Sequence, residues 1–315
     1  MSVRTGLGPI EVALLLTLDD IGARTDRPYI KSARVLHEVD HRSGIAPAYA
    51  YRAACDLAAS WAAPVPLIDG HGNMGAPGVA PANPRYTELR LTTAGALAVA
   101  AERSVAPSVP IGLINGNMYA GGHRPPFRPI AVVRALLALL EDDETDDATL
   151  LDICGPPAFP TGCDVSGEVD AVLDGKPGML RLTARIAVAK EDGRAVLRIS
   201  NMPPGVDSLT VMNAIAARAE PRPWDKLPPR LAASIGLPIT DVNDHSSGDA
   251  ALVICKLPPG VVPDNVAHRV KSEVWGAHVD VNSALPAPLP LLLRKWITDH
   301  ATDESAHVLQ RLVPL

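Results

Sequence analysis

The amino-acid sequence predicts an α+β fold, with helices dominating the first half and strands joining them in the second. Up to residue 141 the apolar residues form helix-length runs. After an acidic stretch at residues 141–147, they alternate with polar residues at the two-residue period of a strand. The 315 residues are 47% hydrophobic, which is enough for a substantial core in two domains. We expect one domain at residues 1–141 and a second at residues 142–315.

Composition restricts the kinds of protein this chain could be. Aromatic residues make up only 3%, against 31 prolines and 24 glycines, so we expect a core of Ala, Leu, Val and Ile with many turns. A net charge of −6 argues against a generic basic coat for nucleic acid but allows a local basic groove. Four scattered cysteines without a C-x-x-C pair argue against a zinc knuckle. The apolar run at residues 12–18 is too short to cross a membrane, which favours a cytoplasmic, nucleoid-associated protein.

The first domain is expected to open with three short helices, at residues 9–22, 31–40 and 46–62. Pro9 suits the first turn of a helix, and Gly22 suits the position just after its end. Three short helices before a turn and a Gly-rich loop favour a helix-turn-helix or winged-helix arrangement. Residues 68–84 would form the wing or a strand-turn unit beside it. Two more helices are predicted, at residues 89–103 and 130–141.

The second domain is expected to contain a β-hairpin. Apolar residues alternate over residues 180–189, a turn follows at Glu191-Asp192-Gly193-Arg194, and residues 196–199 resume the pattern. Helices at residues 208–217 and 263–275 and a strand at residues 250–256 complete an α+β domain.

Arg85 and Tyr86 carry the most suggestive chemistry in the chain. A free tyrosine hydroxyl titrates near pH 10, so a nucleophilic tyrosine needs activation. A neighbouring guanidinium can hold a phosphate and stabilise developing charge. Two structural alternatives compete when the dipeptide is considered alone: Tyr86 as a half-buried aromatic at a helix start, and Arg85 in a surface ion pair with Glu88.

Several motifs surround this dipeptide in a fixed order, and together they resemble the A subunit of bacterial type IIA topoisomerases, the family of DNA gyrase and topoisomerase IV. The resemblance covers nearly the whole chain. The segments that carry it are Arg4-Thr5-Gly6-Leu7-Gly8-Pro9, Lys31-Ser32-Ala33-Arg34-Val35, Leu67-Ile68-Asp69-Gly70-His71-Gly72-Asn73-Met74-Gly75, Arg85-Tyr86-Thr87-Glu88-Leu89-Arg90-Leu91, Ile114-Asn115-Gly116, Gly155-Pro156-Pro157-Ala158-Phe159-Pro160-Thr161 and Met202-Pro203-Pro204.

The resemblance implies a winged-helix DNA-gate domain followed by a tower-like α/β domain. It implies that Tyr86 attacks a DNA phosphate and becomes 5′-phosphotyrosyl linked, with Arg85 steadying that phosphate. The loop from Gly70 to Gly75 is expected to lie close to the tyrosine as a structural element. Residues assigned to DNA binding are Arg4, Lys31, Ser32, Arg34, His41 and, near the position of a base-pair wedge, Arg124.

Partners and cofactors also follow from the resemblance. The chain would bind double-stranded DNA as a homodimer and join a B-type subunit in an A2B2 assembly. No cofactor is assigned to the chain itself. Mg²⁺, and ATP as a second candidate, would come through the B-type partner, because two-metal chemistry suits phosphoryl transfer.

Departures from the family pattern leave a second hypothesis open. Glu11 stands in place of a basic cluster, the expected histidine pair is missing around Ser43, and Asp56 occupies a position expected to be basic. The family's C-gate coiled coil and DNA-wrapping β-pinwheel are expected to be absent. The first hypothesis is a DNA-cleaving isomerase subunit. The alternative is a degenerate, non-cleaving paralogue that binds DNA or gyrase subunits in a regulatory or drug-decoy role.

Overall fold

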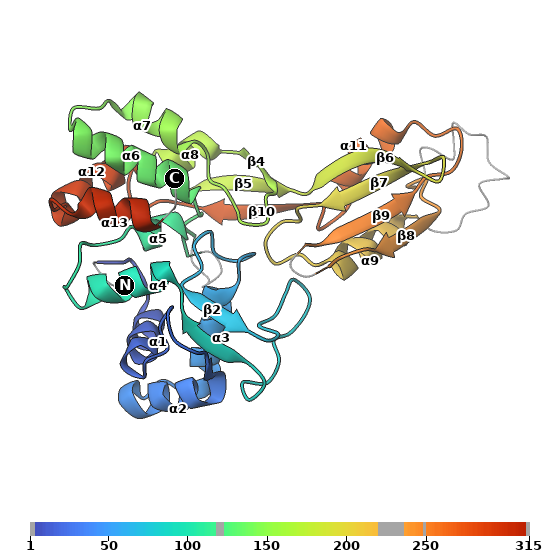
Figure 1. Cartoon of the computed structure of the whole chain (residues 1–315). Coiled ribbons are helices and arrows are strands. Elements are labelled where there is room, and N and C mark those ends of the chain that lie inside the picture. The colour runs from blue at the N-terminus through green and yellow to red at the C-terminus, as the bar shows by residue number, and fades with distance from the viewer. Residues whose placement is uncertain (1–3, 118–122, 220–235, 248–249, 313–315) are drawn as a thin grey trace.

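The computed structural model describes residues 4–117, 123–219, 236–247 and 250–312. Helices and three small antiparallel sheets build it, which confirms the predicted α+β class. Figure 1 shows a helical body, below which a smaller unit holds the N-terminal helices. A four-stranded sheet with two helices projects to one side. No helix in these ranges is long and apolar enough to cross a membrane.

The N-terminal unit combines three helices with a three-stranded sheet. The helices are α1 (Pro9–Asp20), α2 (Ser32–Ser43) and α3 (Pro47–Ala58), which contact one another. The strands are β1 (Ile30–Lys31), β2 (Ile68–His71) and β3 (Glu88–Leu91), in the order β1-β3-β2. All three predicted helices are therefore present, and the third ends at Ala58 instead of Ala62.

The prediction of a helix over residues 89–103 was wrong at its start. Residues 89–91 form a strand instead. Leu89 and Leu91 are buried while Glu88 and Arg90 are partly exposed, so the burial follows the two-residue period of a strand. The helix α4 (Thr93–Glu102) begins only after Thr92, whose hydroxyl accepts a hydrogen bond from the backbone N–H of Gly95 at 3.0 Å. This cap fixes the helix start.

The larger hydrophobic core joins the N-terminal unit to the helical body. Residues 285–312 contribute to this core together with residues 7–182, since α12 contacts α6, and α13 contacts α4 and α6. The division into residues 1–141 and 142–315 stays a prediction, and the core shows that the last helices return to the first half. The helices of this body are α5 (Ile111–Ile114), α6 (Pro129–Glu141), α7 (Asp147–Cys154), α12 (Leu289–His300) and α13 (Ser305–Leu312).

A second three-stranded sheet leads out of this body in the order β10-β5-β4. It contains β4 (Asp164–Gly167), β5 (Gly178–Thr183) and β10 (His278–Ser283), with the short helix α8 (Val169–Leu173) after β4. Residues 180–183, predicted to belong to the hairpin, lie in this sheet instead. The chain leaves it at Ala184, whose backbone N–H donates to Ala277 O at 2.8 Å.

The projecting sheet has the order β6-β7-β9-β8 and a core of its own. The predicted hairpin forms one side of this sheet, because the edge strand β6 pairs with β7 through a two-residue turn in which Asp192 has a φ of 48° and Gly193 a φ of 77°. The predicted strand and both predicted helices are also present. The elements are β6 (Arg185–Glu191), β7 (Arg194–Ser200), β8 (Asp241–Asp244), β9 (Leu252–Lys256), α9 (Ser208–Arg218) and α11 (Pro263–Glu273).

Gly95 gives a test of how closely α4 packs on the N-terminal sheet. A Cβ at this position would collide with the carbonyl oxygen of Leu67 and touch Leu91. We expect Gly95→Ala to lower the free energy of unfolding by about 1–3 kcal/mol, although alanine has the better helix propensity. Urea unfolding measures this change. The control is Thr93→Ala on the exposed side of the same helix, expected to stay within about 0.5 kcal/mol of wild type. Equal effects of the two variants would contradict the close packing.

Candidate functional site

Tyr86 lies exposed on a tight turn that immediately precedes β3. The residue is 67% exposed and lies outside the helices, so it is neither half-buried nor at a helix start. The backbone N–H of Tyr86 donates to Asn83 O at 2.8 Å, and the Asn83 side-chain oxygen accepts from the backbone N–H of Arg85 at 3.2 Å. An asparagine at the first position of a turn commonly makes this bond. The turn therefore presents the phenol to solvent from a hydrogen-bonded frame.

Arg85 lies beside this phenol and is not paired with Glu88. Its guanidinium carbon is 5.4 Å from the centre of the Tyr86 ring, and its Nε donates to the Asn83 side chain at 3.3 Å. The carboxylate of Glu88 instead contacts Lys31 and His71. A cation next to an exposed phenol is suited to holding an anionic group there.

The N-terminal end of α2 holds the backbone of the turn. The N–H of Ser32 donates to Thr87 O at 2.9 Å, and the N–H of Ala33 donates to Pro84 O at 3.2 Å. Both acceptors flank Arg85 and Tyr86. The Ser32 side chain is fully buried, with its Oγ 2.7 Å from Thr87 Oγ1. The prediction that Ser32 contacts DNA therefore needs correction, because its hydroxyl faces the interior and supports the turn.

The Gly-rich loop lies against the same turn, as predicted. Gly72 has a φ of +93°, and a Cβ there would lie 3.0 Å from the carbonyl oxygen of Tyr86. A side chain at this position would be strained by the backbone and crowded by the turn. The loop thus acts as a close-fitting support for the Tyr86 backbone.

The face of the sheet near this turn carries two polar networks. In the first, Lys31 Nζ and His71 Nδ1 lie 2.9 and 3.1 Å from the two carboxylate oxygens of Glu88. Hydrogen bonds from Lys31 and then His71 hold the pKa of Glu88 below its ordinary value. The antiparallel register places these three residues in one cross-strand row. Lys31, predicted to bind DNA, is therefore tied to the sheet beside the turn.

The second network lies on the same sheet and was not predicted. Asp69 accepts from Tyr29 Oη at 2.7 Å and from Arg90 Nε at 2.8 Å, and the Arg90 guanidinium stacks 4.1 Å from the Tyr29 ring centre. The hydrogen bond to Asp69 raises the pKa of Tyr29. Asp69 and Arg90 are cross-strand partners, and only the register of β2 against β3 brings them together.

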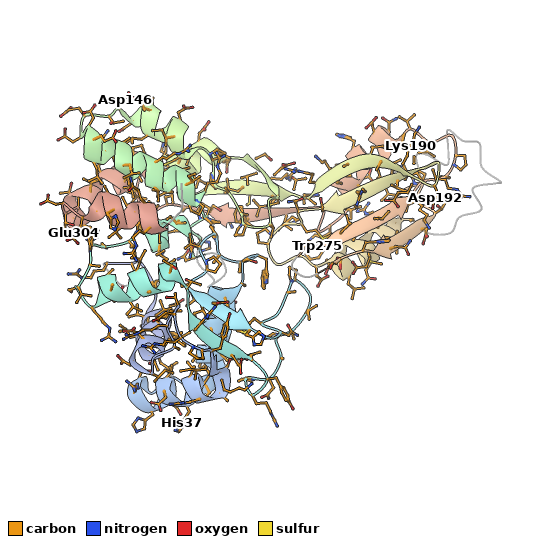
Figure 2. The ribbon with its side chains drawn as sticks, viewed as in Figure 1. His37, Asp146, Lys190, Asp192, Trp275 and Glu304 are labelled. Atoms are coloured by element: carbon orange, nitrogen blue, oxygen red, sulfur yellow. The ribbon has the colours of Figure 1, made fainter. Side chains whose placement is uncertain are left out.

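Two predicted DNA-binding residues lie on the outer surface of α2. Arg34 and His41 are both exposed, near the beginning and the end of the helix. Figure 2 shows His37 of the same helix projecting away from the rest of the molecule. The outer side of α2 is thus accessible to a large partner.

Arg4 and Arg124, also predicted to bind DNA, are brought together at a different place. Both line a largely apolar cavity of about 300 Å³ that also contains Trp296 of α12. Arg4 Nη1 donates to Ala101 O at 3.4 Å, and burial lowers the pKa of Arg124. None of the lining residues comes from the Tyr86 turn. These two arginines and the α2 residues therefore belong to separate surfaces of the structure.

The cysteines and the possible metal ligands in the described ranges do not form a second candidate reactive centre. All four cysteines are buried free thiols, and burial raises the pKa of Cys55 to about 11 and the pKa of Cys154 to about 12. Such thiols are poor nucleophiles near neutral pH. Among the described residues, no group of three or more His, Cys, Asp or Glu side chains is arranged to hold a metal ion.

The Glu88 ion pairs predict a pH dependence of stability. A carboxylate whose pKa is lowered on folding stabilises the protein above its unfolded pKa of about 4.3 and loses that effect as the pH falls through the folded value. We therefore expect Glu88→Gln to be less stable than wild type at pH 7, with the difference vanishing toward pH 3. Urea unfolding at several pH values measures it. Glu141→Gln, at an exposed carboxylate, is the control and should show no such trend. A pH-independent difference for Glu88→Gln would refute the ion-pair explanation.

Comparison with known proteins gives matches to the A subunits of DNA gyrases over most of the chain. It is 30% identical to the one from Thermotoga maritima over 81% of this chain and 34% of that protein. It is 28% identical to the one from Granulibacter bethesdensis over 85% of this chain and 30% of that protein. It is 26% identical to the one from Deinococcus deserti over 99% of this chain and 43% of that protein. No protein-family model matches the chain. The chain spans about a third of the length of these two curated relatives from Granulibacter bethesdensis and Thermotoga maritima. The resemblance to the A subunit of type IIA topoisomerases is thereby confirmed.

Proposed function

We propose that this chain acts as an A-like subunit of a type IIA DNA topoisomerase. It binds duplex DNA and, with a B-type partner, cleaves and rejoins it through Tyr86. One observation carries the proposal: an exposed tyrosine beside an arginine, on a turn held from several sides, in a chain that matches gyrase A subunits over most of its length. Exposure suits a nucleophile that must reach a phosphate in a large substrate.

The proposed reaction is a reversible transesterification. The Tyr86 oxygen attacks a DNA phosphorus and loses its proton to solvent or a base. The new P–O bond leaves the protein joined to the 5′ end of the cut strand. The bond from phosphorus to the 3′ oxygen breaks, and that oxygen leaves as a protonated 3′ hydroxyl. Rejoining is the same exchange in reverse, so no bond energy is lost. Arg85, whose guanidinium lies beside the Tyr86 ring, would bind the phosphate and stabilise its added negative charge.

The N-terminal unit is proposed to be the winged-helix DNA gate. Its support is the sequence of α1, α2 and α3 followed by the small antiparallel sheet, with Arg34 and His41 exposed on α2. The projecting sheet with α9 and α11 would be the tower-like part. In this proposal, DNA lies along the outer side of α2 and reaches Tyr86 at the adjacent turn.

Partners complete the proposed active form. Two copies of the chain would cut the two strands, and a B-type subunit would join them in an A2B2 assembly at the nucleoid. The B-type subunit would hold the Mg²⁺ that promotes phosphoryl transfer, and its ATPase would drive any strand passage. The residues of this chain would supply the nucleophile, the phosphate-binding cation and the DNA-binding surface.

Tyr86→Phe tests the nucleophile directly, because it removes one oxygen and keeps the ring. The protein is incubated with supercoiled plasmid, Mg²⁺ and B subunits of DNA gyrase or topoisomerase IV, then treated with detergent and protease. We expect protein-linked breaks with wild type and none with Tyr86→Phe, while gel shifts show that both bind DNA. If wild type shifts DNA in the gel but gives no protein-linked breaks with any B subunit, the cleavage proposal is wrong. The alternative of a non-cleaving DNA-binding paralogue is then favoured.

Arg34→Ala tests the proposed DNA path along α2. Each lost phosphate contact reduces the number of counterions released on binding, so the slope of log affinity against log salt should become less steep by about 0.9. Fluorescence anisotropy with a duplex at several salt concentrations measures it. The matched control is Lys190→Ala, at the far end of the projecting sheet in Figure 2, which should keep the wild-type slope. An unchanged slope for Arg34→Ala would place the DNA elsewhere.

A further inference from the structure

A chain of three hydroxyl groups, two of them on fully buried residues, lies against the turn that carries Tyr86. Tyr51 of α3 donates from Oη to the carbonyl oxygen of Ala82 at 2.5 Å, and its Oη is 3.1 Å from Thr87 Oγ1. Thr87 Oγ1 lies 2.7 Å from Ser32 Oγ. Ala82 and Thr87 are the residues immediately before and after the segment 83–86. One phenol therefore bridges both ends of the turn.

The burial of this chain makes it costly to disturb. Thr87 and Ser32 are fully buried, and a buried hydroxyl without a partner is destabilising. Thr87 donates its proton to Ser32, so the Tyr51 hydroxyl supplies the proton on its own side of the chain, toward Ala82 O and Thr87 Oγ1. Burial also raises the pKa of Tyr51, so its hydroxyl stays a proton donor at neutral pH. Tyr51 is thus partly buried and hydrogen-bonded, whereas Tyr86 is exposed.

The chain complements the backbone bonds from α2. Those bonds fix the carbonyl groups of Pro84 and Thr87, while Tyr51 fixes Ala82 and the Thr87 side chain. Tyr51 reaches the start of the turn from α3, a separate helix. A nucleophile must be held close to its attack geometry, because small misplacements reduce rates strongly.

We propose that Tyr51 is a positioning residue for Tyr86, because its hydroxyl ties Ala82 to Thr87 and holds the turn between them in one conformation. The inference rests on the proposed role of Tyr86 as the nucleophile. It predicts two separate effects of removing the Tyr51 hydroxyl: a looser turn and a slower cleavage step. DNA affinity should stay the same, because the Tyr51 hydroxyl is bonded within the protein to Ala82 and Thr87.

The first measurement is amide hydrogen exchange of wild type, Tyr51→Phe and the control Tyr49→Phe. Tyr49 lies two residues earlier on α3 and is 67% exposed, so losing its hydroxyl should leave the turn unchanged. In Tyr51→Phe we expect exchange at residues 83–87 to quicken about fivefold, the effect of one lost hydrogen bond, with exchange in α1 and α6 unchanged. This readout needs neither DNA nor a partner.

The second measurement is the rate of plasmid cleavage with Mg²⁺ and the B subunit that supports cleavage by wild type. We expect Tyr51→Phe to cleave about fivefold more slowly at saturating DNA, with the same DNA affinity. Tyr49→Phe should match wild type. Thr87→Ser, which keeps the hydroxyl, should retain near-wild-type exchange and cleavage, whereas Thr87→Val should resemble Tyr51→Phe. If Tyr51→Phe fails to fold, Thr87→Val breaks the same chain and replaces it.

The outcomes separate this inference from the proposed function. Unchanged exchange at residues 83–87 in Tyr51→Phe overturns the positioning role, whatever happens to cleavage. Faster exchange with an unchanged cleavage rate also overturns it, because the turn would then not need the bridge. If wild type never cleaves, the function of Tyr86 fails and the positioning role falls with it, while the exchange data still show whether Tyr51 holds the turn.

Discussion

The N-terminal end of α2 docks on the turn that carries Arg85 and Tyr86, and the rest of the site depends on that contact. Two backbone N–H groups at the start of the helix, which would otherwise lack partners, donate to carbonyl groups on either side of the dipeptide. The same contact aligns β1 with β3 and buries the side chain of Ser32 against Thr87. Helix, strand and turn are thus fixed by one set of hydrogen bonds, and an exposed tyrosine can have a defined position.

Burial divides the polar groups of this region into two classes. The hydroxyls of Ser32, Thr87 and Tyr51 lie beneath the turn and hold its shape, since each would be destabilising without a partner. The charged groups on the sheet, with Glu88 between Lys31 and His71, are partly exposed and are therefore weaker supports. Arg85 and Tyr86 remain on the outside, where they can meet a substrate.

The arrangement of the two cores explains how the chain combines its parts. Residues 285–312 return to the helical body, so the projecting sheet is an excursion out of a core that the chain later rejoins. Figure 1 shows β5 and β10 running side by side between the body and the projecting sheet. The cavity lined by Arg4 and Arg124 contains no residue of the Tyr86 turn, so these two arginines lie apart from the turn.

The sequence by itself determined the fold class, most helices, the hairpin of β6 and β7 and the Arg85-Tyr86 dipeptide, because apolar periodicity, turn residues and ordered motifs are local signals. Tertiary structure alone decided that residues 89–91 form a strand. Their alternation of apolar and charged residues is too short to indicate a strand until β3 pairs with β1 on one side and β2 on the other. It also decided that Ser32 is buried and that Tyr51 bridges Ala82 to Thr87. These contacts join residues that are 31 to 55 positions apart, and their hydroxyls are ordinary in the sequence until folding brings them together.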